Sequence, residues 1–184
     1  DQPSTNQELL EEISVLKQRI QALGQSESER ARAEEALKES EKKYRNLFEN
    51  AGEAIFVAQD SKLMFTNPIT TMITGYSAEE LTNKSFIEFI YPDDRDTVIK
   101  RYIRRLKGEY IPPDRYSFRI IHRDGSVKWV ELNAVLIQWE GKAATLNFLI
   151  DITDRKRAED ALRESEERFK LLVENATYGI FVQT

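Results

Sequence analysis

The sequence predicts an α+β fold, an antiparallel sheet covered by helices on one side, with a long helix before it and another after it. Between residues 51 and 153, two short segments rich in β-branched and aromatic residues precede several helical ones, and three more such segments follow. This order of elements is typical of an antiparallel sheet whose helices gather on one face. Outside this zone Glu, Lys, Arg, Gln, Ala and Leu dominate, and these residues are good helix formers.

The segment before residue 50 has the apolar spacing of a coiled-coil helix. A first apolar seam, with steps of four and three, contains Leu9, Ile13, Leu16, Ile20 and Leu23. A second contains Ala33, Leu37, Ser40, Tyr44 and Leu47. Because the phase slips between the two seams, near Gly24, we expect a local overwinding or a break there. Each seam is short, so an amphipathic helix that lies on its own domain remains an alternative.

Turn and capping signals divide the middle zone into strands and helices. The predicted strands are Ala54–Gln59, Leu63–Thr66, Arg115–Arg123, Ser126–Trp139 and Ala143–Ile152. The Asp-Gly pair between the third and fourth strands favours a tight hairpin turn. Pro68 and Gly75 bound a short helix, and a capping box from Ser77 to Glu80 begins the next. Ser85 is expected to cap a further short turn.

The longest helix of the middle zone is predicted over Asp93–Leu106. Acidic residues stand at its start and basic residues toward its end, which matches the helix dipole. We assign Tyr102, Ile103 and Leu106 to its buried face and the basic run Lys100–Lys107 to solvent, rather than to nucleic acid. Its first aspartates, Asp93, Asp94 and Asp96, are explained by N-terminal capping more simply than by a metal cluster.

The zone after Asp154 is helical again and repeats the first. The segment AEEALKESE at 33–41 matches AEDALRESE at 158–166, a distance of 125 residues. A period of this length indicates tandem domains, so we expect a piece of a longer protein. The predicted parts are a helix over 1–40, a whole domain over 41–153, a linker helix over 154–175 and the first strand of a second domain over 176–184.

Four motifs stand in order along the middle zone. They are Asn67 with Thr74–Leu81 (TGYSAEEL), Tyr91–Arg95 (YPDDR), Arg123–Glu131 (RDGSVKWVE) and Asp151–Thr153 (DIT). Together, over about residues 41–157, they resemble the motifs of the PAS family, the sensor modules of bacterial and archaeal signalling proteins such as sensor histidine kinases. Tyr91 departs from the family's histidine. The resemblance implies a five-stranded antiparallel sheet with helices on one face, in agreement with the order of elements.

The resemblance also implies a ligand pocket and a signal-coupling exit. Its candidate pocket residues are Phe56, Met72, Phe89, Ile103, Phe118, Leu132 and Ala134. Whether side chains fill this pocket or leave it open is not readable from one sequence. The coupling residues are Asp151, Ile152, Thr153 and Arg155, and Arg155 or Lys156 is expected to pair with Asp151.

Composition excludes several classes of function. The formal net charge of −5 argues against nonspecific nucleic-acid binding, which needs clustered Lys and Arg. The chain has no cysteine, which excludes disulfides, thiolate metal sites and the cysteine–flavin adduct of light-sensing relatives. His122 lacks companion ligands and is assigned to a strand surface. In haem-binding relatives the ligand lies on the long helix, which has no histidine here, so we identify no cofactor and expect neither haem nor metal.

We therefore expect a sensory module without catalytic residues of its own. It would form a homodimer through its flanking helices and relay a signal to an adjacent PAS domain and an output domain, a histidine kinase or a diguanylate cyclase. Two hypotheses stay open: a module with a small-molecule ligand, and a ligand-free module that dimerises and relays. Since no signal peptide or apolar run of about 20 residues is present, we expect a cytoplasmic portion, with membrane association of the parent left open.

Overall fold

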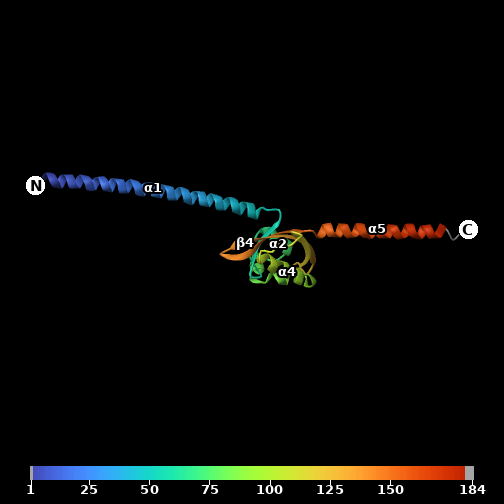
Figure 1. Ribbon diagram of the computed structural model, residues 1–184. Helices are drawn as coiled ribbons and strands as arrows, with labels where there is room; N and C mark the ends of the chain where they lie inside the picture. Colours follow the sequence, from blue (N-terminus) through green and yellow to red (C-terminus); the bar gives the residue numbers. More distant parts are fainter. Residues whose placement is uncertain (1, 181–184) are drawn as a thin grey trace. The chain divides into compact units, whose positions relative to one another are not determined.

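The computed structural model describes residues 2–180, with side chains for residues 10–173. The chain divides into two compact units, Asp1–Phe48 and Glu49–Thr184. The first unit is one helix, α1 (Gln2–Glu49), drawn at the blue end of Figure 1. It runs without interruption past Gly24, so no break separates the two apolar seams. A single glycine costs a helix interior about 1 kcal/mol, which a long helix tolerates.

The helix α1 extends beyond residue 40, the predicted boundary of the central domain. That boundary was set at residue 40, whereas the helix continues to Glu49 and the second compact unit begins there. No proline or glycine interrupts residues 41–49, and the next helix breaker is Gly52. The seam side chains Ile13, Leu23, Leu37 and Leu47 are exposed.

The second unit contains the predicted five-stranded antiparallel sheet. Its strands are β1 (Ala54–Gln59), β2 (Lys62–Thr66), β3 (Arg115–Ile121), β4 (Val127–Trp139) and β5 (Lys142–Asp151). Their spatial order is β2-β1-β5-β4-β3, so the two hairpins flank the last strand. The β3–β4 turn forms at the predicted Asp-Gly pair, where Gly125 adopts a φ of 86° that favours glycine.

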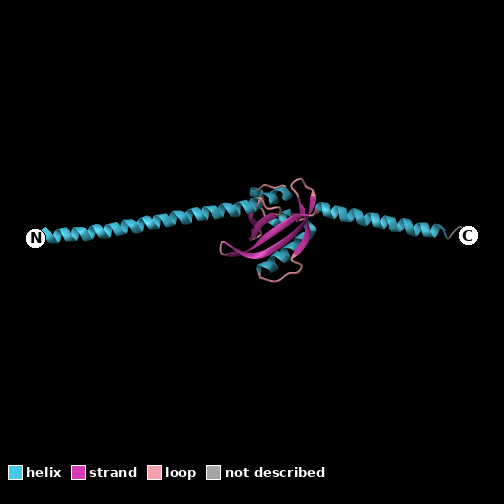
Figure 2. Ribbon diagram, turned by 90° about the horizontal axis from the view of Figure 1, so that it is seen from above, coloured by secondary structure: helices cyan, strands magenta, loops and turns pink. Residues whose placement is uncertain are grey.

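Short helices and one longer helix cover one face of this sheet (Figure 2). They are α2 (Pro68–Thr74), α3 (Ala78–Asn83), the 3₁₀ turns Phe86–Phe89 and Pro92–Asp94, and α4 (Arg95–Leu106). The capping box predicted at Ser77 is present, and Ser85 caps the first 3₁₀ turn as expected, there too through a capping box. The buried core, which includes Leu81, Val98 and Val130, lies between these helices and the sheet.

Asn67 fixes α2 to the first strand. Its Oδ1 accepts hydrogen bonds from the Thr70 backbone N at 3.2 Å and from the Ile55 backbone N at 2.9 Å. Its Nδ2 donates to the Glu53 carbonyl at 2.9 Å. One side chain therefore caps a helix and holds it against β1, which explains why a buried asparagine stands at this position.

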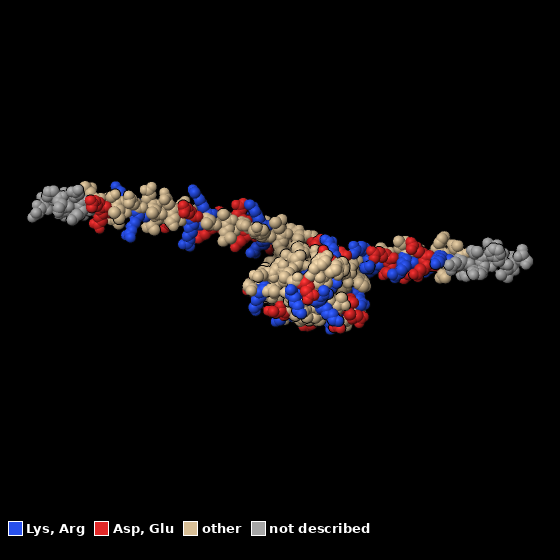
Figure 3. Space-filling model, in the orientation of Figure 1, with Lys and Arg blue, Asp and Glu red and all other residues tan. Residues whose placement is uncertain are grey.

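The last helix, α5 (Thr153–Ile180), leaves the sheet directly after β5. The prediction of a strand from residue 176 is wrong for residues 176–180, which are helical, and residues 181–184 lie outside the described part. A strand needs neighbouring strands for its backbone hydrogen bonds, and residues 2–180 contain no second sheet for it to join. Figure 3 shows acidic and basic side chains alternating along α5, where ion pairs such as Arg163–Asp160 form.

Candidate functional site

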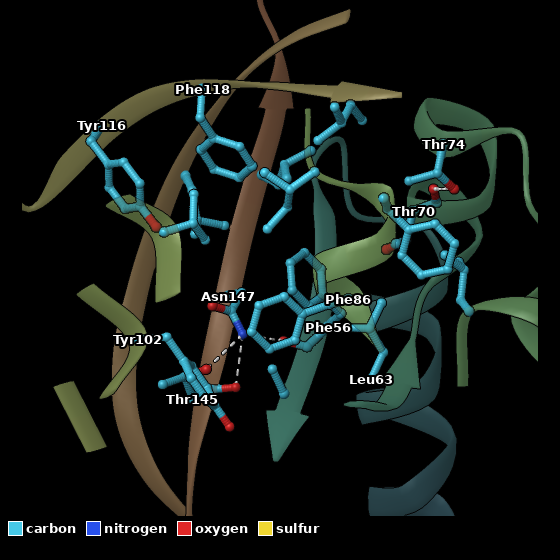
Figure 4. A pocket seen from close by; sticks show the side chains of 18 of the residues that line it. Phe56, Leu63, Thr70, Thr74, Phe86, Tyr102, Tyr116, Phe118, Thr145 and Asn147 are labelled. Atoms are coloured by element: carbon cyan, nitrogen blue, oxygen red, sulfur yellow. Dashed lines mark hydrogen bonds between the residues drawn. The ribbon is translucent and has the colours of Figure 1, made fainter. Parts of the chain in front are cut away.

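A cavity lies between the helices and the inner face of the sheet. Its volume is about 80 Å³, and its wall is mostly apolar. The aromatic side chains in its wall are Phe56, Phe86, Phe89, Tyr102, Tyr116 and Phe118. Figure 4 shows Tyr102 and Tyr116 at one end, with Thr70 and Thr74 at the other. Concave, mostly apolar pockets with a few polar groups are the usual form of small-molecule sites.

Thr145 and Asn147 of β5 form a polar patch in this wall. The Asn147 Nδ2 donates to the Thr145 carbonyl at 2.9 Å, to the Thr145 Oγ1 at 3.0 Å and to the Phe56 carbonyl at 3.3 Å. Both residues are buried. Because these bonds already occupy the amide protons, the pair shapes the cavity wall and has little capacity left to donate to a ligand.

The end of the cavity next to α4 is positively charged. Among the described residues in the wall, Arg105 is the one with a charged side chain, and it is 8% exposed. Burial lowers the pKa of its guanidinium. Burial also raises the pKa of Tyr116 on β3 to about 12, against the opposing charges of Arg105 and Arg101. The Arg101 Cζ lies 4.2 Å from the centroid of the Tyr116 ring.

The exit from the sheet into α5 is a compact hydrogen-bond network. The Asp151 Oδ1 accepts from the Thr153 backbone N at 2.9 Å and from the Thr153 Oγ1 at 2.5 Å. The Trp129 backbone N donates to that same Oγ1 at 3.1 Å, and the Ile152 backbone N donates to the Trp129 carbonyl at 2.9 Å. The start of α5 is therefore bound to both β5 and β4.

The charge partner of Asp151 is Lys128, whose Nζ lies 3.2 Å from its Oδ2. Burial acts to raise the pKa of Asp151, but the hydrogen bonds from Thr153 and the Lys128 ammonium outweigh it and hold the pKa below 3.8. Val130 pairs with Asp151 across the two strands, and Lys128 lies two residues before Val130, on the same face of β4. Sheet register therefore selects this partner.

Known proteins resemble this chain in sequence and in fold. The family model described as the PAS fold matches residues 63–147. The central domain belongs to the PAS family. The crystal structure of the PAS domain of an HTR-like protein from Haloarcula marismortui superposes with a TM-score of 0.56 and 27% identity, covering 66% of this chain and 98% of that one.

Two curated relatives contain a similar PAS segment. The methyl sulfide methyltransferase-associated sensor of Methanosarcina acetivorans is 29% identical over 79% of this chain and 14% of its own length. Sporulation kinase A of Bacillus subtilis is 29% identical over 76% of this chain and 23% of its own length. The chain thus spans less than a quarter of either relative, and what it shares with them is a sensory PAS domain.

The predicted pocket residues of the PAS domain divide into three groups. Phe56, Phe89, Phe118 and Leu132 line the cavity, and Ala134 is buried in the adjoining core. Met72 and Ile103 were wrong, because their side chains are 70% and 46% exposed.

Helix geometry explains both errors and a missed residue. In α2 the inward positions are Thr70, Ile73 and Thr74, which places Met72 on the opposite side. In α4 the buried positions are Val98 and Arg105, seven residues apart and so on one face. That spacing was a usable signal for Arg105, but a basic residue in a basic run was assigned to solvent. Arg105 instead lines the cavity.

The expected coupling partners of Asp151 were also wrong. The Arg155 Nη2 instead lies 3.2 Å from the Glu131 Oε2, and the Lys156 Nζ lies 2.9 Å from the Glu159 Oε2. Arg155 still contacts β4, because Glu131 is a β4 residue. Arg155 therefore contacts the sheet through Glu131 rather than through Asp151.

Asp94 does not cap α4, contrary to the sequence-based explanation. Its side chain makes no capping bond to the helix. Its Oδ2 accepts from the Arg119 backbone N at 2.8 Å and from Nε at 3.0 Å, and its Oδ1 accepts from Nη2 at 2.9 Å. The turn before α4 runs beside β3, where the Tyr91 backbone N donates to the Arg119 carbonyl. The Asp94 carboxylate therefore lies within hydrogen-bond distance of the Arg119 guanidinium. The pair joins the helical layer to the sheet.

Two further findings concern the part of the chain that the structure describes. None of its helices is both long enough and apolar enough to cross a bilayer. No group of three or more His, Cys, Asp and Glu side chains is placed there to hold a metal ion.

Proposed function

We propose that this PAS domain senses a small molecule in its cavity and transmits the resulting change through α5 to an output domain of the parent protein. The observation that carries the proposal is that β4 belongs to both sites. Leu132 of β4 lines the cavity, and Trp129, three residues earlier, hydrogen-bonds the first residue of α5. A shift of β4 around a ligand therefore acts on the base of α5 over a short path.

Pairing with a second copy completes the proposed relay. In α5 the residues Ala158, Leu162, Ser165, Phe169 and Leu172 keep steps of four and three, like the second seam of α1. Leu162, Phe169 and Leu172 are exposed. Paired in parallel, two such helices form a coiled coil with more than one packing arrangement. A ligand that binds one arrangement more tightly shifts the population toward it.

Variants of the exit test this relay in the parent protein. We expect Asp151→Ala and Thr153→Ala to preserve the circular dichroism spectrum but to disconnect output activity from the signal. Asp154→Ala is the matched control, because its carboxylate is 99% exposed and pairs only within α5 to Arg157 in the described structure. Output that still follows the signal in both exit variants contradicts the relay.

A ligand-free module that only dimerises and relays is the second candidate. It is favoured by the small volume of the cavity, about 80 Å³, against the 300–1,000 Å³ of typical ligand pockets. Native mass spectrometry of the purified chain separates the two, because only the sensing module retains a bound compound or gains one from a metabolite mixture.

A further inference from the structure

Arg105 is a buried basic residue whose position in the cavity wall the fold alone does not explain. Its side chain is more than nine-tenths buried and lines the cavity. Among the described residues, no carboxylate lies within ion-pair distance of its guanidinium and no acceptor hydrogen-bonds it. Its neighbour Arg104, by contrast, is exposed and paired, with its Nε 2.5 Å from the Glu109 Oε2. Removing most of a charged side chain from water without a counter-ion in contact is unfavourable, so the position of Arg105 in the cavity wall calls for an explanation.

A second guanidinium at the same end is also incompletely bonded. The Arg101 Nε is buried without a hydrogen-bond partner, while its Nη2 donates to the Pro113 carbonyl at 2.6 Å. Arg101 stacks on Tyr116, which lines the cavity beside Arg105. Asp114 acts on Arg105 only as a long-range charge, without an ion pair. Positive charge is thus concentrated at this end of the cavity, where Arg105 lines the wall and Arg101, outside the wall, has one unbonded donor, its Nε.

The rest of the wall defines what kind of anion fits. Apart from Arg105 the wall is mostly aromatic and aliphatic. Its threonine and asparagine side chains, Thr70, Thr74, Thr145 and Asn147, already hydrogen-bond within the protein. Inorganic phosphate would place its remaining oxygens against phenyl rings, where they would lose their hydration. A carboxylate matches the planar guanidinium and presents only two oxygens. An engineered cavity of about 150 Å³ holds benzene, so a volume of about 80 Å³ admits a short branched chain or, with slight expansion, one ring.

We propose that Arg105 binds the carboxylate of a small apolar acid whose hydrocarbon part occupies the cavity. The assignment rests on the proposed sensory function and specifies its ligand class. Because the carboxylate would be a counter-ion in contact with Arg105, ligand binding and stabilisation of the domain are coupled through this one side chain.

Paired acids and amides test the charge requirement. The probes are benzoate and 3-methylbutanoate, with benzamide and 3-methylbutanamide as uncharged isosteres and inorganic phosphate as an anion without an apolar part. In thermal-shift and calorimetric titrations of the whole chain, we expect each acid to bind about 10–100-fold more tightly than its amide. Phosphate is expected to leave the melting temperature unchanged. Equal affinity of acid and amide, or no binding by either acid, overturns the proposal.

The variant Arg105→Met separates a ligand-binding role from a structural one. Replacing an unpaired buried charge by an apolar side chain of similar length should leave the ligand-free melting temperature unchanged or raised, and the acids should no longer bind more tightly than the amides. Arg104→Met is the matched control and should bind the acids like the wild type. Arg105→Lys keeps a charge without the two-pronged geometry and should bind with intermediate affinity.

Failure of the carboxylate assignment can be told apart from failure of the sensory function. An Arg105→Met variant that melts well below the wild type and still prefers the acids would show that Arg105 is structural. Amides that bind as tightly as acids would leave a sensory cavity but remove the carboxylate assignment. The exit variants Asp151→Ala and Thr153→Ala test the relay without reference to any ligand class.

Discussion

At the scale of single residues, the domain depends on close contacts that join its helices to its sheet. His122 is one example. The sequence assigned it to a strand surface, but its ring packs on Gly75, at the end of α2. A Cβ at Gly75 would lie 2.6 Å from the His122 Cε1, and Gly75 adopts a φ of 77°. Glycine is required there both by backbone conformation and by space.

Two glycine variants separate these causes. Gly141 has the same φ of 77°, but a Cβ there would meet nothing within 4 Å. We expect Gly141→Ala to destabilise the domain by about 1 kcal/mol, the cost of the left-handed backbone alone. Gly75→Ala should cost clearly more, because the His122 ring must also move. Urea unfolding followed by tryptophan fluorescence measures both, and equal losses would show that the ring yields freely.

The Asp94–Arg119 pair predicts a pH dependence. The hydrogen bonds from Arg119 lower the pKa of Asp94 below 3.8, outweighing the opposing effect of burial. A carboxyl whose pKa is lower in the folded state stabilises the fold above its unfolded pKa and loses that effect as pH falls through the folded pKa. Asp94→Asn should therefore melt a few degrees below the wild type at pH 7, with the difference shrinking below about pH 4.

Melting curves of both proteins from pH 7 to pH 2 check this expectation. Glu79→Gln is a control for general loss of acidic charge, because Glu79 is an exposed residue of α3. A difference between Asp94→Asn and wild type that stays constant to the lowest pH would contradict the assigned protonation.

At the scale of elements, α5 is the part whose apolar residues the domain leaves uncovered. Leu162 and Phe169 are exposed at 61% and 69%, and their spacing repeats that of Leu37 and Tyr44 in α1. Exposed apolar seams of this kind favour pairing with another helix. Because the two seams match, we expect the same pairing geometry for α1 and for α5 in the proposed dimer.

Charge placed in the α5 seam should disrupt pairing without affecting the sheet. We expect Phe169→Asp to shift sedimentation from dimer toward monomer, because two carboxylates would face each other in a coiled coil. Glu167→Lys, off the seam and exposed, is the control and should stay dimeric. A wild-type chain that sediments as a monomer at all concentrations rules out the proposed dimer.

At the scale of the whole molecule, the chain has two compact units, and among the side chains of residues 10–173 the buried core belongs to the second unit. The buried clusters draw on residues from Ala54 onward. Both tryptophans, Trp129 and Trp139, are in β4, so their fluorescence reports unfolding of the PAS domain. The stability of that domain should therefore depend little on α1.

Removing residues 1–48 tests this independence. We expect the shortened chain to retain the cooperative tryptophan transition within about 3 °C of the full chain, since small losses of surface contact shift the melting temperature by only a few degrees. Far-UV circular dichroism should lose helix signal at the same time. A shortened chain without a cooperative transition would mean that α1 contributes to the fold.

Signals within the sequence were enough to predict the elements whose causes are local. Turn residues, capping boxes and strand alternation placed all five strands and the short helices, because these signals act within a few residues. The tertiary structure alone decided which groups meet across the fold: Asp94 with Arg119, Asp151 with Lys128, and Arg105 with the cavity rather than solvent. Such contacts depend on sheet register and on how a helix is rotated against the sheet, and residues distant in sequence set both.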